Sequence, residues 1–216
     1  AAALVANAAV ITGLFLFARH SVKEEFSEKL ANAMTTIEVP AGQRFDLVLE
    51  DGTKVKMNSG AVLKYPSLFR KNSREVSLNG EAFFEVAHDS ARPFTVHTFA
   101  SDVSVLGTRF NIDADRGTDT FSAVLVEGSV KVTSTSNPCE YIIMQPSDMV
   151  SLENGHLTYK GHYSPADLSW TEGIVVLDGL DFDTLIRKLE KAYGVDIVID
   201  RKIVPSMEGI TGELRI

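Results

Sequence analysis

The sequence is poor in the residues on which many enzymes and small secreted folds depend. It has a single cysteine, Cys139, so no internal disulfide can form. Its five histidines are scattered, with no pair at the spacing of metal ligands. It also lacks a nucleophile elbow and a phosphate-binding loop. These absences exclude a disulfide scaffold and argue against an enzyme, a metal centre or a bound cofactor.

Positive charge is outnumbered by negative charge, and tryptophan and tyrosine are few. The chain carries 21 Lys and Arg against 29 Asp and Glu, a net charge of −8. Non-specific binding to nucleic acid needs a basic surface, so we expect no direct contact with nucleic acid. One Trp and five Tyr in 216 residues give little material for an exposed platform that stacks on sugars.

Charge is absent from the first 18 residues. A helix of that length is roughly 27 Å long, close to the thickness of the hydrocarbon core of a bilayer. A signal peptide and a buried helix are the alternatives, but no clean small-x-small cleavage site precedes Arg19. We therefore predict a transmembrane helix over 1–18. Because the chain begins with Ala rather than Met, we expect this helix to continue upstream.

A second helix is predicted to follow the membrane span. Val22, Phe26, Leu30 and Met34 recur every four residues and form one apolar stripe. Ser21 precedes this stripe with the spacing of a capping box. These features predict a juxtamembrane helix over 19–36.

Short apolar runs separated by turn signals fill residues 37–163. Alternation of buried and exposed positions is clear in 82–86, 94–96 and 103–105. A strong hairpin signature, Asp51-Gly52, lies between two such runs. Further turns are expected at Asn58-Ser59-Gly60, Asn79-Gly80, Glu127-Gly128 and Asn154-Gly155. The region is predicted to be an all-β domain, either a sandwich or a short solenoid.

The alternation changes phase at Leu106-Gly107-Thr108. Val103 and Val105 lie on one phase and Phe110 lies on the other, which a bulge at Gly107 would absorb. Glu81 and Glu85, the most prominent pair of carboxylates in the region, share one face of a strand. No other catalytic group accompanies them, so we interpret them as structural.

The order of these segments resembles the periplasmic part of FecR-type transmembrane anti-sigma factors, also called sigma regulators. The resemblance covers nearly the whole chain from about residue 42, and it implies a β-solenoid-like middle domain. It is carried by residues 49–58, 74–86, 92–96, 105–111 and 126–132.

The last part of the chain, 164–216, has the pattern of a small α+β domain. Ile174 begins a short apolar strand, Asp181 is a plausible N-cap, and Gly194 is placed to end the helix. The alternating residues Val195, Ile197 and Ile199 predict a second strand, which gives a βαβ unit. In the FecR family this stretch resembles a domain related to the secretin and TonB short N-terminal domain. Compared with that domain it looks truncated at Ile216.

The resemblance implies a signalling relay across the cell envelope. The protein would be a single-pass protein of the inner membrane, with the residues after about 19 in the periplasm. It would receive the signalling domain of an outer-membrane TonB-dependent transporter and relay the signal to an extracytoplasmic-function sigma factor, with envelope proteases carrying the step. The alternative is a membrane-anchored carbohydrate-binding or scaffold module of the envelope.

Two groups of residues are candidate sites. A partner strand could add to the edges of the βαβ unit, so the candidate partner-binding residues are Trp170, Ile174, Val176, Val195, Ile197 and Ile199. Some FecR-type regulators cleave themselves at a Gly–Thr bond, which here would be Gly107–Thr108. The Thr108 hydroxyl would attack the Gly107 carbonyl, provided that the peptide is strained and an oxyanion donor is present. We favour the structural alternative, in which Gly107 makes a bulge and Thr108 is an ordinary strand residue.

Overall fold

The structure is a computed structural model that describes residues 15, 17–19, 22–24, 28–178, 180–198 and 211–215. Residues 17–19, 22–24 and 28–32 are helical, and a strand already begins at Met34, within the range where a helix was expected. Within these described residues no helix is both long and apolar enough to cross a bilayer. Most of the membrane span expected over 1–18 lies outside the described residues.

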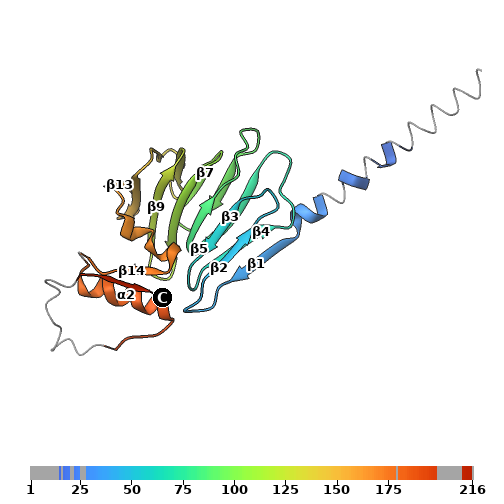
Figure 1. The fold of residues 1–216 in the computed structure, drawn as a ribbon. Coiled ribbons are helices and arrows are strands. Elements are labelled where there is room, and N and C mark those ends of the chain that lie inside the picture. The colour runs from blue at the N-terminus through green and yellow to red at the C-terminus, as the bar shows by residue number, and fades with distance from the viewer. Residues whose placement is uncertain are drawn as a thin grey trace, which may run out of the picture.

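Thirteen strands form one continuous hydrogen-bonded sheet, and the long strand β5 (Arg74–Glu85) divides it into two halves (Figure 1). The first half, here called the first sheet, contains the amino-terminal part of β5. Its order is β1 (Met34–Glu38), β4 (Val62–Pro66), β5, β6 (Phe94–His97), β7 (Ser101–Val105), β10 (Val130–Ser134) and β11 (Tyr141–Met144).

The second sheet contains the carboxyl-terminal part of β5. Its order is β2 (Phe45–Val48), β3 (Lys54–Met57), β5, β8 (Arg109–Asp115), β9 (Thr120–Glu127), β12 (Asp148–Glu153) and β13 (His156–His162). The β2–β3 pairing confirms the hairpin predicted at Asp51-Gly52. The turns at Glu127-Gly128 and Asn154-Gly155 also join consecutive strands, as predicted.

Gly80 is the point at which β5 passes from one sheet to the other. Asn79 is the last β5 residue paired with β4, and Gly80 is the first paired with β8. Gly80 has φ of 96°, and a Cβ there would lie 2.8 Å from the Cα of Ala61. The turn predicted at Asn79-Gly80 is therefore wrong, because the glycine permits a bend within a single strand.

The two sheets pack face to face around one apolar core, so the middle region is a sandwich. Phe84, from the second sheet, stacks on Phe110 at 5.2 Å between ring centroids and packs on Phe94 of the first sheet at 6.1 Å. All strand pairs of the sandwich are antiparallel except β5–β6. A solenoid stacks its strands in parallel coils, so the solenoid alternative is wrong.

The phase change at Gly107 also has a different origin from the one predicted. Strand β7 ends at Val105 in the first sheet, and β8 begins at Arg109 in the second. The connection between them crosses from one sheet to the other, so no bulge at Gly107 is needed. The observed register shift lies between Arg109 and Phe110, opposite β9.

A small C-terminal unit follows the sandwich and lies beside one end of it (Figure 1). It contains two short 3₁₀ helices, a strand, an α-helix and a last strand. These are η1 (Pro165–Asp167), η2 (Ser169–Glu172), β14 (Ile174–Val176), α2 (Phe182–Tyr193) and β15 (Glu213–Arg215). The predicted cap at Asp181 is confirmed, since its carboxylate accepts from the Thr184 N–H, and Gly194 ends α2 with φ of 64°.

The predicted βαβ pairing is wrong in one respect. Residues 195–198 form no strand, although Val195, Ile197 and Ile199 alternate in the sequence. The strand that pairs with β14 is instead β15, in antiparallel register, with Val176 opposite Glu213. Ile199 lies outside the described residues. Sequence periodicity over five residues could not distinguish a strand from an extended connection.

Candidate functional site

The outer face of the second sheet is covered, which is unusual for the outer face of an antiparallel sandwich. Lys56, Phe83, Asn111 and Val124 lie side by side on β3, β5, β8 and β9. Phe83 and Val124 are 6% and 3% exposed, yet neither belongs to the core between the sheets. Other residues must therefore shield this row from solvent.

Helix η2 supplies part of this cover. The Lys56 ammonium donates to the carbonyl oxygen of Thr171 at 3.2 Å, and the Arg44 guanidinium donates to that of Trp170 at 2.9 Å. Trp170 itself is buried. The candidate partner-binding residue Trp170 thus lies inside the protein, and its carbonyl oxygen helps to join η2 to the sandwich.

Lys191, on the last turn of α2, makes the second contact with the sandwich. Its ammonium donates to a Glu81 carboxylate oxygen at 2.8 Å and to an Asp113 oxygen at 3.1 Å. Glu81 also accepts from the amides of Asn58, at 2.8 Å, and Asn111, at 3.1 Å. These contacts agree with the structural role predicted for Glu81, and they join segments 110 residues apart in the sequence.

The charges of this cluster influence one another strongly. Burial raises the pKa of Asp113, and the negative charge of Glu81 raises it further. Burial alone would lower the pKa of Lys191, but the two carboxylates outweigh it and raise that pKa overall. Lys191 is therefore charged at neutral pH. Its side chain stays 32% exposed, so solvent screens the interaction in part.

The backbone at the end of α2 also touches the sandwich. A Cβ on Gly194 would lie 2.6 Å from the Ala41 carbonyl carbon, and one on Gly42 would lie 2.7 Å from the Tyr193 carbonyl oxygen. Both glycines have positive φ. This close approach places Lys191 over Glu81 and Asp113. No sequence pattern predicted the contact between the end of α2 and the sandwich.

Strand β14 has one free edge within the described part of the chain. Its opposite edge pairs with β15, and the Leu177 N–H donates to the Gly212 carbonyl at 2.9 Å. Because hydrogen bonding alternates along an antiparallel ladder, the Val176 N–H is directed to the free edge. Ile174 and Val176 are half-buried, Val195 is 49% exposed and Ile197 is half-buried.

Gly107 and Thr108 lie in a crowded connection. A Cβ on Gly107 would lie 2.7 Å from the Cα of His88, which explains a glycine at this position without invoking cleavage. The Thr108 hydroxyl donates to the Ser129 carbonyl at 3.2 Å, and Thr108 is 4% exposed. No hydrogen bond to the Gly107 carbonyl oxygen is found among the described residues.

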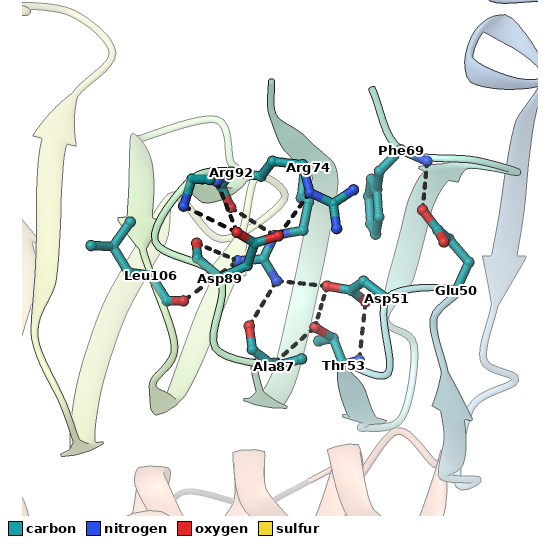
Figure 2. A network of polar contacts seen from close by, with 10 residues as sticks. Glu50, Asp51, Thr53, Phe69, Arg74, Ala87, Asp89, Arg92 and Leu106 are labelled. Atoms are coloured by element: carbon teal, nitrogen blue, oxygen red, sulfur yellow. Dashed lines mark hydrogen bonds and ion pairs between the residues drawn. The ribbon is translucent and has the colours of Figure 1, made fainter. Parts of the chain in front are cut away.

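A buried charge network lies beside this connection (Figure 2). The Arg74 and Asp51 side chains are 0% and 2% exposed and form an ion pair at 2.8 Å. Arg74 also donates to the carbonyl oxygens of Arg92, at 2.8 Å, and Ala87, at 2.7 Å. The same Asp51 accepts from the Thr53 backbone and hydroxyl. Arg74 thus ties the β2–β3 turn to the loop after β5, which indicates a structural role.

Comparison with known proteins agrees with this architecture. The family described as FecR protein matches residues 35–131. Two crystal structures from Parabacteroides distasonis ATCC 8503, each assigned as an anti-sigma factor, are similar over 84% of this chain and 84% of theirs. Their sequence identities are 30% and 31%, with TM-scores of 0.72 and 0.73. The comparison with curated proteins gives no match.

The family match covers β1 to the start of β10, and the structural likeness extends well beyond it. At 30% identity or more over most of both chains, the likeness concerns sequence as well as fold. This chain belongs to the FecR family of anti-sigma factors.

Proposed function

We propose that the chain is the periplasmic sensor region of a membrane-anchored anti-sigma factor. Membership of the FecR family and the likeness to proteins assigned as anti-sigma factors support a role in regulating a sigma factor. In this proposal residues 1–18 anchor the protein in the inner membrane. The input is the signalling domain of an outer-membrane TonB-dependent transporter. The output is an extracytoplasmic-function sigma factor, and envelope proteases act between the two.

The free edge of β14 is the proposed receiving surface. A short strand with unpaired backbone groups can accept a strand from a partner, which provides affinity without a deep pocket. Ile174 and Val176, the first and last residues of β14, are half-buried rather than fully covered. The exposed Val195 and the half-buried Ile197 belong to the same C-terminal unit and are proposed as a secondary part of this surface.

Calorimetric titration tests this proposal. The full chain in detergent micelles is titrated with isolated signalling domains of TonB-dependent transporters from the same genome, and we expect saturable binding to one of them. Val176→Pro removes the N–H at the free edge, so we expect the affinity to fall by about tenfold or more. Val176→Ala keeps that N–H and serves as the matched control.

Two results would contradict the proposal. Equal affinity of the Val176→Pro and Val176→Ala variants would show that the partner does not add a strand to β14. Binding to a saccharide array without binding to any signalling domain would favour the alternative, an envelope carbohydrate-binding or scaffold module.

The Gly107–Thr108 peptide is proposed to be a structural turn rather than a self-cleavage site. The lack of a hydrogen bond to the Gly107 carbonyl oxygen among the described residues supports this, since an attacked carbonyl needs donors for its developing charge. We expect intact-mass spectrometry to show only the uncleaved chain after prolonged incubation at neutral pH. Two fragments that meet at residues 107 and 108, and that disappear in Thr108→Ala, would establish self-cleavage.

A further inference from the structure

We propose that Lys191, Glu81 and Asp113 form a reversible latch that holds helix α2 closed on the second sheet. The latch is a property of this chain alone and does not depend on the proposed function. One cation on α2 meets two carboxylates on neighbouring strands, at 2.8 and 3.1 Å. The two acids lie opposite each other in the β5–β8 ladder, so a single side chain can reach both.

The sheet side of the latch is already organised to receive a cation. Glu81 is held by amides from two different segments, Asn58 at 2.8 Å and Asn111 at 3.1 Å. Asp113 is brought next to it by strand register rather than by a hydrogen bond between the two acids. Two adjacent carboxylates repel each other, and a positive charge between them relieves this repulsion. The sheet therefore favours the closed position of α2 through charge.

Besides Lys191, helix α2 meets the sandwich through the close backbone approach of Gly194 to Ala41 and Gly42, which involves no buried side chain of the helix. No residue of α2 is buried, although the helix has a well-defined cap at each end. Helix η2, by contrast, contains the buried Trp170, and two of its carbonyl oxygens accept hydrogen bonds from Arg44 and Lys56 of the sandwich. Lys191 remains 32% exposed, and partly exposed ion pairs are weak and sensitive to salt. Helix α2 can thus open while η2 stays in place.

Opening would alter the neighbourhood of β14. In chain order this strand lies between η2, which is anchored, and α2, which is latched. A ligand that binds the open arrangement more tightly than the closed one would shift the population toward the open arrangement. The size of the shift is limited by the difference between the two affinities. The latch consequently provides a two-state element that a partner could bias.

Hydrogen–deuterium exchange of the full chain tests the latch. Lys191→Met removes the cation, and we expect amide exchange across 182–193 to become roughly two- to fivefold faster. Lys191→Arg retains the charge and should exchange like the parent chain. Lys188→Met makes the same change of charge on the same helix. The Lys188 side chain forms no hydrogen bond or ion pair within the described part of the chain, so this variant is the matched control.

Salt gives an independent readout. Raising the ionic strength from about 0.05 M to 1 M should speed amide exchange of α2 in the parent chain and in Lys188→Met, because salt screens the attraction between Lys191 and the two carboxylates. Lys191→Met lacks this attraction, so salt should not speed its exchange. Equal exchange of Lys191→Met and the parent chain, or an equal increase in Lys188→Met, would overturn the latch.

Discussion

Replacing Arg74 with Met is expected to lower the free energy of unfolding by about 3–5 kcal/mol. The substitution leaves the Asp51 carboxylate, 2% exposed, without its ion-pair partner in the interior. It also removes the donors to the carbonyl oxygens of Arg92 and Ala87. Urea unfolding of the full chain in detergent micelles, followed by the fluorescence of Trp170, measures the change.

Arg92→Met is the matched control for Arg74→Met. Arg92 pairs with Asp89 at 2.8 Å, but both side chains are partly exposed, so we expect a much smaller loss of stability. The double variant Arg74→Met/Asp51→Asn should lose less than the sum of the single variants, because it leaves no unpaired buried charge. A loss for Arg74→Met no larger than that for Arg92→Met would show that the buried network does not stabilise the fold.

Phe84→Ala is expected to cost about 3–5 kcal/mol of stability. The ring of Phe84 is fully buried and contacts Phe110 and Phe94, so its removal leaves a cavity between the two sheets. Thermal unfolding followed by circular dichroism should show a clearly lower Tm.

The control for this prediction is Phe45→Ala on the edge strand β2. Phe45 is 45% exposed, so truncation removes less buried area and creates no closed cavity. A similar fall in Tm for Phe45→Ala and Phe84→Ala would mean that the packing between the sheets does not dominate stability.

Sequence patterns correctly predicted the turns and helix ends whose conformation is set by residues close to one another in the chain. The Asp51-Gly52 hairpin, the Asp181 cap and the Gly194 stop depend on residues within one turn of the chain, and all three are confirmed. Alternation in the β-rich region predicted the core face correctly, since Phe84, Phe94 and Phe110 are all buried. The family resemblance was found through the same short segments and is confirmed by comparison.

The features that the sequence did not predict depend on distant pairing. A glycine after Asn79 has the signature of a turn, and only its position beside Ala61 makes it a bend within β5. The pairing of β14 with β15 skips the nearer apolar run, which no local pattern could indicate. Lys191 is one of two lysines on helix α2, and nothing in its local sequence distinguishes it from Lys188. Its role depends on two carboxylates that lie 78 and 110 residues away.

The sharing of β5 between the sheets has a mechanical consequence. Strand β1, which follows the N-terminal helical segments, pairs with β4, and Val62 of β4 pairs with Asn79 of β5. Two residues further along β5 is Glu81, which holds Lys191. Tension between the N-terminal segment and α2 would therefore pass through three strands, β1, β4 and β5. Backbone ladders of several hydrogen bonds resist such a load together, whereas α2 is joined to the sandwich by the Lys191 side chain and by the close approach of Gly194 to Gly42, without a ladder. A pull between the two ends would open that joint before it separated either sheet.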